Sequence, residues 1–338
     1  MEIKRIAVDT SKHVFTLVAV DGGGHAVLRR ELKRHQVEPF FRKQPSTEVV
    51  LEACGGSHHW GRTLMALGHS VRLLPAQYVK PFVRRGKNDR HDALAIAEAA
   101  GRPEVRAVPV KSAEQQAAAT ILRVRELLMK QQTQLANAMR GHASEFGVIV
   151  GKGIGNAPAL VERVQADAGV PEAAQEMIAV LGAQLAALQA QIAVLDRKIA
   201  AQHKGHPVSR MLAEVPGIGV HGALTLALTV DAAQFRSGRH FAAWLGLTPK
   251  QHSTGGKPRL GGISREGNER LRALLVLGAT SVVRVAKPGR RNASDWLLQL
   301  LGRKPRKVVA VALANKMARI VWAMMRSGEA YRHAPAVG

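Results

Sequence analysis

The sequence predicts an α/β domain at its N-terminus, then a coiled coil, then an all-α domain. Short apolar runs separated by turn residues occupy residues 3–74, as in strands that alternate with helices. Long alanine- and leucine-rich stretches follow from residue 113 onward, with apolar residues at helical spacing. We therefore expect an α/β domain over residues 1–150, a coiled-coil segment over 151–205 and a helical domain over 206–338.

The N-terminal elements form an antiparallel meander followed by alternating helix and strand. In order, we expect strands 3–8, 14–20 and 26–32, a helix over 36–43, a strand ending at Glu52, a helix over 58–67, a strand over 70–74 and a helix from Pro75. The run Asp21-Gly22-Gly23-Gly24 is typical of a hairpin turn. This is the element order of the RNase H-like fold, in which carboxylates cluster at one end of the sheet.

The middle of the chain predicts two long helices. The first spans residues 113–145, and the glycines between 147 and 155 indicate a break. Two series with a spacing of seven follow: Ile178, Leu185, Ile192 and Ile199, and Leu181, Leu188 and Leu195. Interleaved series of this kind are the a and d positions of a coiled coil. A long helix packed on its own domain would give the same pattern, and both interpretations stay open.

The last third of the chain resembles a helix-hairpin-helix followed by further helices. Pro216-Gly217-Ile218-Gly219 would form the turn, and the N–H groups of Gly217 and Gly219 could bind a phosphate. Pro-Gly turns between helices are common, so the motif has a purely structural alternative. Further helices are expected from Leu271 to Val285 and over 307–327.

Charge indicates a polyanionic partner. The chain has 49 Lys and Arg against 25 Asp and Glu, a formal charge of +24 with a pI of about 11.2. Aromatic residues make up only 4%, which favours contact with backbone phosphates over base stacking. The single cysteine, Cys54, which we expect to be a small buried residue, fits a reducing cytoplasm. We find no uninterrupted apolar stretch of bilayer length and no secretory signal, and therefore expect a cytoplasmic protein without a membrane.

The candidate phosphate contacts gather in a few basic stretches. Residues 284–307 hold eight Lys and Arg against Asp295 alone, a net charge of +7. The full set of candidate nucleic-acid contacts is Lys80, Arg84, Arg85, Lys87, Gly217, Gly219, Lys257, Arg259, Arg265, Arg290, Arg291, Arg303, Lys304, Arg306 and Lys307.

Four acids are the candidate metal ligands: Asp9, Glu52, Asp89 and Asp92. Asp9 and Glu52 each end an apolar run, and Asp89 and Asp92 share one face of a predicted helix. Mg²⁺ prefers carboxylates and water, and paired metal ions stabilise both oxygens of a phosphoryl displacement. Any one of these acids could instead be a helix cap or a turn former. The ordered set, in so basic a chain, favours a metal site.

The ordered motifs resemble those of the IS-one-ten family of insertion-sequence transposases over residues 3–328. They are Val8-Asp9-Thr10-Ser11-Lys12, Leu51-Glu52-Ala53-Cys54-Gly55, Lys87-Asn88-Asp89-Arg90-His91-Asp92-Ala93, Pro216-Gly217-Ile218-Gly219, Phe241-Ala242-Ala243-Trp244-Leu245-Gly246-Leu247-Thr248-Pro249 and Gln251-His252-Ser253-Thr254-Gly255-Gly256-Lys257. The last of them is similar to the IS-eleven-eleven branch. Piv-type DNA invertases are related to this family.

The resemblance implies a RuvC-like domain whose Asp-Glu-Asp-Asp site binds Mg²⁺ or Mn²⁺, and a transposase domain with a serine nucleophile. It also implies a guide non-coding RNA that pairs with donor and target DNA. The working assembly would be a homo-oligomer, a dimer or a tetramer, with each site shared between protomers. The serine would attack a phosphodiester and form a covalent phosphoserine link.

Two adjacent hydroxyls, Ser253 and Thr254, are the candidate nucleophiles. Alignment of the Gly-Leu-Thr-Pro stretch without a gap places Thr254 at the family's Ser-Gly position, whereas the Ser-Thr-Gly-Gly form of the branch indicates Ser253. Chemistry favours Ser253, because a primary hydroxyl approaches phosphorus with less crowding than a β-branched one. Ser264 precedes an apparent helix and is predicted to be its N-cap. The alternative for the whole loop is a solvated, glycine-rich linker.

Other function classes are compatible with parts of the sequence. A RuvC-type endonuclease that cleaves by water attack would need the four acids but no serine-bearing half. A non-enzymatic nucleic-acid binder would need neither. A zinc site is disfavoured, because the chain has one cysteine and no His/Cys pairs at finger spacing. We expect all four tryptophans, 60, 244, 296 and 322, to lie in the core.

Overall fold

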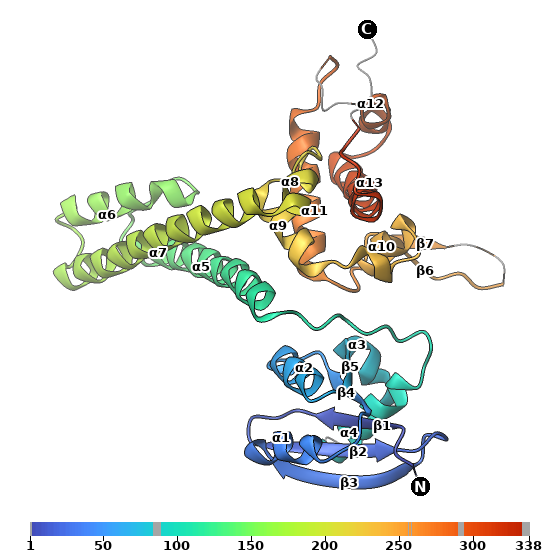
Figure 1. Ribbon diagram of the computed structural model, residues 1–338. Helices are drawn as coiled ribbons and strands as arrows, with labels where there is room; N and C mark the ends of the chain where they lie inside the picture. The colour runs from blue at the N-terminus through green and yellow to red at the C-terminus, as the bar shows by residue number, and fades with distance from the viewer. Residues whose placement is uncertain (1, 84–88, 256, 258, 290–293, 333–338) are drawn as a thin grey trace. The chain divides into compact units, whose positions relative to one another are not determined.

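The chain folds into two compact units, residues 1–117 and 118–338. The computed structural model describes residues 2–83, 89–255, 257, 259–289 and 294–332, except the side chains of Asp89 and Arg90 (Figure 1). The first unit is mixed α/β and the second is helical, as the sequence predicts. The expected domain boundaries at residues 150 and 205 stay predictions.

The first unit is built on a five-stranded sheet with the order β3-β2-β1-β4-β5. The strands are β1 (Arg5–Asp9), β2 (Val14–Val20), β3 (Ala26–Lys33), β4 (Glu48–Glu52) and β5 (Ser70–Leu74). Strand β2 runs antiparallel to β1 and β3, whereas β1, β4 and β5 are parallel. Val8 pairs with Leu51, so β1 and β4 end next to each other.

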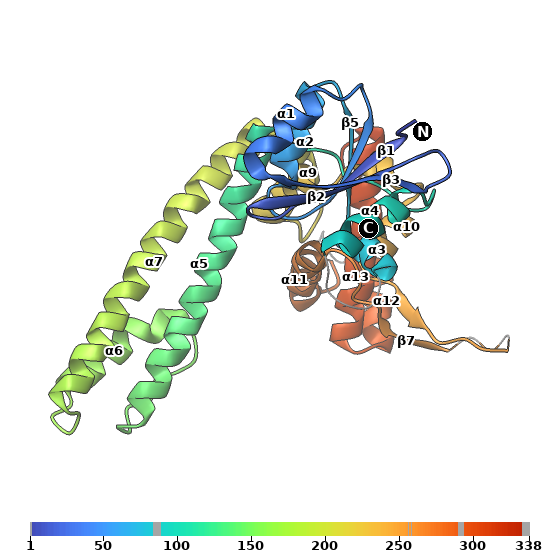
Figure 2. The ribbon, with the colours of Figure 1, turned by 90° about the horizontal axis from the view of Figure 1, so that it is seen from below.

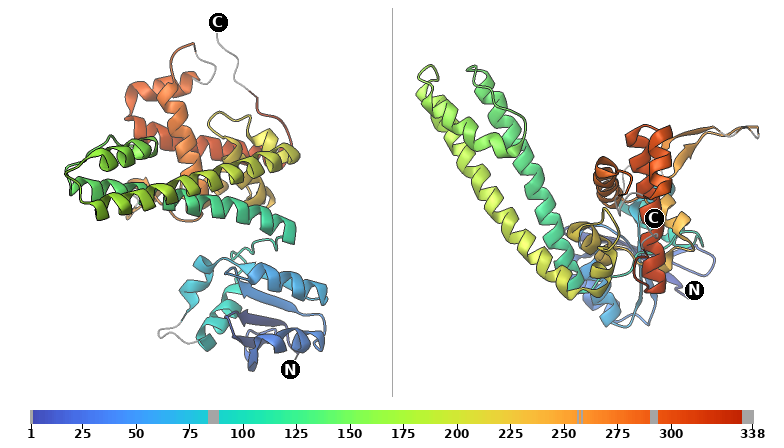
Figure 3. Two further views of the ribbon diagram at one scale, coloured as in Figure 1. Left: turned by 90° about the vertical axis from the view of Figure 1, so that its left-hand side faces the viewer. Right: turned by 90° about the horizontal axis from the view of Figure 1, so that it is seen from above.

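Helices cover both faces of this sheet, because alternate strand residues are apolar on each side. Val8 and Leu51 share a buried cluster with α1 (Arg34–Arg42) and α2 (Ser57–Ala66). Ala7 and Val50 share a buried cluster with α4 (Asp89–Ala100) on the opposite face. The strands and helices of this unit are drawn in blue to teal in Figure 3. A short α3 (Ala76–Val79) and the 3₁₀ helix η1 (Lys80–Phe82) lead into α4.

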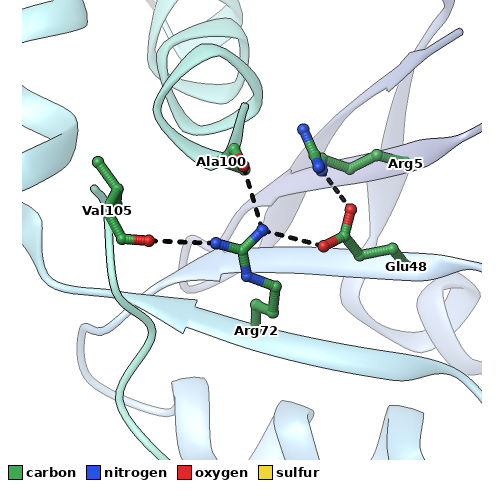
Figure 4. Close-up of polar contacts among 5 residues, drawn as sticks. All are labelled: Arg5, Glu48, Arg72, Ala100 and Val105. Atoms are coloured by element: carbon green, nitrogen blue, oxygen red, sulfur yellow. Dashed lines mark hydrogen bonds and ion pairs between the residues drawn. The ribbon is translucent and has the colours of Figure 1, made fainter. Parts of the chain in front are cut away.

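An arginine network fixes the C-terminal end of α4 to the sheet (Figure 4). Arg72 donates to the Ala100 carbonyl at 3.1 Å, to the Val105 carbonyl at 3.2 Å and to Glu48 Oε1 at 3.0 Å. Arg5 Nε donates to the other carboxylate oxygen of Glu48 at 2.5 Å. Because its last residue is held at the middle of β5, α4 begins near the carboxyl ends of the strands.

The second unit begins with a helical hairpin. It comprises α5 (Ala113–Ser144), η2 (Ile154–Asn156), α6 (Ala157–Ala166) and α7 (Glu172–Gly205), and α5 and α7 run alongside each other (Figure 2). The series Ile178, Leu185, Ile192 and Ile199 is buried, and Ile178 and Leu185 share a cluster with α5 and α6 of the same chain. This series therefore serves the fold of its own subunit, which is the alternative to self-association that the spacing left open.

The opposite side of α7 is exposed and largely apolar, with Gln184 and Gln191 as its polar residues. Val180 and Val194 are 59% and 41% exposed, and Ala183, Ala187 and Ala190 between them are exposed as well. By length and composition alone, α7 and α13 (Arg306–Ser327) could each cross a membrane, but core helices pass the same test. Helix α13 is such a core helix, with seven buried residues. The expected absence of a membrane stays a prediction.

The remaining elements form a helical bundle around α13. They are α8 (Pro207–Leu212), α9 (Val220–Thr229), η3 (Ala232–Gln234), α10 (Gly238–Trp244), β6 (Pro249–Gln251), β7 (Leu260–Ile263), α11 (Glu269–Val285) and α12 (Asp295–Arg303). The Asn268 side chain caps α11 by accepting from Leu271 N, so the prediction of Ser264 as N-cap is wrong. Trp296 is 37% exposed under the Lys316 ammonium, which corrects its placement in the core.

Candidate active site

Three of the four candidate acids lie on one face of the sheet, at its carboxyl end. Asp9 ends β1 and Glu52 ends β4, and the register of these parallel neighbours sets the two side by side. Both follow the alternation of Ala7 and Val50, so they point to the side covered by α4. Asp92 lies in the first turns of α4. The fold thus places acids that are far apart in the sequence at the same end of the sheet.

Glu52 is electrostatically strained. Burial raises the pKa of its carboxyl above the ordinary value of 4.5, and the charge of Asp92 raises it further. Two carboxylates that repel each other in a partly buried site favour either a proton or a cation between them. The donor set, all carboxylate oxygen, fits a hard divalent ion such as Mg²⁺.

The acids do not form a closed cage. Within the part of the chain that the structure describes, no three acidic, histidine or cysteine side chains lie close enough together to hold a metal ion. Asp89 begins α4, but its side chain lies outside the described residues. The convergence of all four acids therefore stays a prediction. Cys54, two residues after Glu52, is exposed, so the expectation that it is buried is wrong.

The candidate nucleophiles lie on a β-hairpin that projects from the helical unit (Figure 1). Strands β6 and β7 pair in antiparallel fashion, and every described residue from Pro249 to Gly262 is exposed. We call residues 249–262 the arm. It carries Lys250, Lys257 and Arg259 and no acidic residue. A surface of this charge attracts a polyanion.

The root of the arm is rigid. Gly246 and Gly267 both have positive φ, 69° and 78°, and a Cβ on either would collide with the backbone of the facing segment, at Glu266 or Trp244. Arg272 Nη1 donates to the carbonyls of Leu245 and Glu266, both at 3.0 Å. These contacts fix the direction in which the arm leaves the bundle.

Within the arm, the two hydroxyl residues have different contacts. Ser253 Oγ accepts hydrogen bonds from Gln251 Nε2 at 2.9 Å and from the Arg259 backbone N–H at 3.1 Å. Thr254 stabilises the arm through its backbone. Its carbonyl accepts a hydrogen bond from Lys257 N at 3.1 Å, across a turn in which Gly255 has a φ of 57°.

Comparison with known proteins decides the family. The Transposase IS116/IS110/IS902 family matches residues 209–294, and a second transposase family matches residues 6–147. A Sinorhizobium fredii protein named as a transposase is 52% identical over 335 residues, covering 98% of this chain and 87% of its own length. The transposase for insertion sequence element IS1111A of Coxiella burnetii is 36% identical, covering 98% and 92%. The chain belongs to the IS110/IS116 family of transposases.

A pilin gene-inverting protein is a more distant relative of this transposase. The pilin gene-inverting protein of Moraxella lacunata is 26% identical over 125 residues, which cover 36% of the chain and 38% of the relative. The transposase is thus an enzyme that binds, cleaves and rejoins DNA, and enzymes of its DEDD class use a divalent metal ion.

Most described candidate phosphate contacts of the transposase are exposed. They are Lys80, Gly219, Lys257, Arg259, Arg265, Arg303, Lys304, Arg306 and Lys307. Gly217 is only partly exposed: it has φ of 88°, and a Cβ there would lie 2.7 Å from the Gly278 carbonyl of α11, so its role as a phosphate contact stays a prediction. Arg84, Arg85, Lys87, Arg290 and Arg291 lie outside the described residues.

Sequence reasoning missed the residues that hold the arm and its serine. Gln251 and Arg272 act through contacts with residues two and 27 positions away. Alternate residues of a strand share a face, so a strand predicted here would have placed Gln251 beside Ser253. Strand β6 has only three residues, and so short a pattern cannot be detected in the sequence.

Proposed function

We propose that the transposase joins DNA strands through a covalent serine link, with metal ions held by Asp9, Glu52, Asp89 and Asp92. The observation that carries this proposal is the grouping of Asp9, Glu52 and Asp92 at one end of a sheet, in a chain that also presents hydroxyls on an exposed basic arm. The strand order with β2 alone antiparallel supports an RNase H-like domain.

The chemistry divides between the two units. The four acids would hold Mg²⁺, which supplies charge neutralisation at the scissile phosphate when bound. The Ser253 hydroxyl attacks phosphorus, the Oγ–P bond forms and the bond from phosphorus to the leaving sugar oxygen breaks. The serine proton passes through solvent to that oxygen, so the exchange is balanced. Attack by the new sugar hydroxyl reverses it and rejoins DNA.

The proposed recombinase would bind a guide RNA in addition to DNA. A guide RNA of the bridge type would direct it to donor and target DNA, and the excess of positive charge supports binding of nucleic acid. The resemblance to pilin gene-inverting proteins supports site-specific joining over simple cleavage. Sequencing of the nucleic acid that copurifies with the protein tests this part: absence of RNA encoded by the element itself would contradict it.

Affinity for nucleic acid should fall steeply with salt. Neutralising a phosphate releases about 0.9 counterion per contact on duplex DNA, so log K against log [salt] should have a strongly negative slope. Replacement of Arg303, Lys304, Arg306 and Lys307 by serine should make the slope shallower by about 3–4. Filter binding or fluorescence anisotropy across salt concentrations measures it. A slope that is flat in the unmodified protein would contradict polyanion binding.

The exposed side of α7 is the proposed self-association surface. Glu172 and Glu176 lie at its N-terminal end and Arg197 and Lys198 at its C-terminal end. In an antiparallel pair of α7 helices centred near Ala187, Val180 would pack near the partner's Val194. The acidic N-terminal end of each helix would then lie beside the basic C-terminal end of the other. The charges therefore favour a second copy of this chain as the occupant.

Substitution of Ala187 by glutamate should break this association. It would bury two like charges near the two-fold axis and shift the protein to monomer by more than about tenfold in Kd. Ala193→Glu is the matched control, because Ala193 is exposed on the same helix about 120° around its axis. Sedimentation velocity measures the mass of each variant in solution. Equal masses for Ala187→Glu and Ala193→Glu would contradict the proposed self-association surface. Charged substitution of Ile192 is unsuitable, since Ile192 is buried in its own subunit.

A further inference from the structure

The hydrogen bonds of the arm point to a second functional group beside the proposed nucleophile. We infer that Gln251 and the backbone N–H of Arg259 stabilise charge on the Ser253 oxygen during strand transfer, which makes Gln251 a catalytic residue. This inference rests on the proposed role of Ser253 and deepens it.

The two donors reach Ser253 Oγ from opposite strands of the arm. Gln251 is the last residue of β6, and Arg259 immediately precedes β7. The backbone of Arg259 is itself held on both sides, because its carbonyl accepts from His252 N at 2.9 Å while its N–H donates to Ser253. A substitution can therefore remove the Gln251 donor to the serine oxygen, whereas the Arg259 donor belongs to the backbone and stays in every variant.

This arrangement sets the direction of the serine proton. A hydroxyl oxygen has two lone pairs and one O–H bond in roughly tetrahedral directions. Both lone pairs accept hydrogen bonds here, so the O–H points away from Gln251 and Arg259. When the proton leaves to solvent, the vacated electron pair lies in that outward direction and attacks phosphorus.

The same donors act in both directions of the reaction. Negative charge develops on Oγ as the proton leaves, and again when the rejoining sugar hydroxyl displaces the serine from phosphorus. N–H groups already aimed at that oxygen stabilise the charge without reorganisation, as in an oxyanion hole. Both adduct formation and rejoining should therefore slow when the Gln251 donor is removed.

The contacts also separate Ser253 from Thr254. Thr254 contributes its carbonyl to the turn with Lys257, whereas the side-chain oxygen of Ser253 receives the two donors. The donor pair is therefore built around the serine oxygen.

Substitutions of Gln251 with different hydrogen-bonding ability test the inference. Gln251→Glu keeps the shape and loses the N–H donor, Gln251→Leu loses both polar atoms, and Gln251→Lys restores a donor. The protein is expressed in bacteria with a plasmid that carries its insertion sequence. Two products are measured: the covalent protein–DNA adduct, and circular DNA molecules whose strands have been rejoined (circles). We expect adduct and circles to fall about 10–100-fold for Glu and Leu, and within about fivefold of the unmodified protein for Lys.

The outcomes separate a donor from a structural contact. A side chain that only maintains the shape of the arm would tolerate glutamate, so unmodified activity in Gln251→Glu would overturn the inference. Retained plasmid binding in all three variants checks that the arm still folds and engages DNA. In parallel, Ser253→Ala should remove the adduct. An adduct that persists in Ser253→Ala contradicts the proposed nucleophile, whereas loss there with full activity in Gln251→Leu contradicts the Gln251 role alone.

Discussion

Replacement of Glu52 by glutamine should abolish DNA strand transfer and at the same time stabilise the metal-free protein. Activity should fall more than about 100-fold, because a ligand to the proposed metal ions is lost. Stability should rise, because burial and the neighbouring Asp92 both disfavour the ionised carboxyl. Circle formation measures the first effect and thermal melting in EDTA the second. Recombination at the unmodified rate would refute the assignment of Glu52.

The pH dependence of the stabilisation follows from its sign. The folded-state pKa of Glu52 is raised above its ordinary value of 4.5, so the folded protein binds this proton more tightly than the unfolded chain. The stabilisation that this proton gives the folded protein is therefore lost as the pH rises from 4.5 through the raised pKa of Glu52. The difference in Tm between Glu52→Gln and the unmodified protein should grow over that window and be close to zero below it.

Glu48 provides the matched control for Glu52. It lies on the same strand and face, but Arg5 and Arg72 hold its carboxylate at 2.5 Å and 3.0 Å. Glu48→Gln should therefore destabilise the protein, by about 1.5–3 kcal/mol for hydrogen bonds to a charged group that is 23% exposed. The same chemical change should thus have opposite effects on Tm at two positions four residues apart. Stabilisation by both variants would contradict the electrostatic account.

Ser253→Ala should eliminate the covalent link between protein and DNA. The substitution removes the proposed nucleophile and leaves the acids unchanged, so no adduct should be trapped by denaturation while Mn²⁺ binding is retained. Folding should be preserved, because Ser253 is exposed and contributes no buried side chain. Mass spectrometry of the trapped adduct in the unmodified protein should place the DNA fragment on residue 253.

Thr254→Val is the control for that experiment. Valine keeps the branched shape and the backbone turn with Lys257 but removes the hydroxyl. Adduct formation should stay within about fivefold of the unmodified protein if Thr254 acts through its backbone. Loss of the adduct in Thr254→Val, with persistence in Ser253→Ala, would transfer the nucleophile to residue 254. Cleavage without any adduct would favour a RuvC-type endonuclease that uses water.

Much of the first unit could be predicted from the sequence. Strands β2 and β5 begin and end where expected, because their apolar runs are bounded by turn residues. Asp9 and Glu52 were expected at strand ends, and the parallel pairing of β1 with β4 brings those ends together. Sequence spacing could not supply that pairing, since it depends on contacts between segments about 40 residues apart.

In other parts of the chain the sequence pattern predicted a helix correctly but not the contacts that the helix makes. The seven-residue series correctly predicted α7, but periodicity identifies an apolar face without saying what covers it. Helix α6 was missed, because the glycines before it were interpreted as a simple break. Ser264 and Asn268 are both good N-cap residues, and only the end of β7 at Ile263 shows which one starts the helix.

The exposure of the arm has a consequence for the genetics of the insertion sequence. None of the described residues from 249 to 262 is buried, so most substitutions there leave stability unchanged. An element copy with a damaged arm therefore still produces folded transposase with its acids and its DNA-binding charge. Such a protein should compete with intact copies for the same DNA. Arm mutations should consequently be dominant inhibitors of transposition, whereas mutations in the cores of either unit should be recessive.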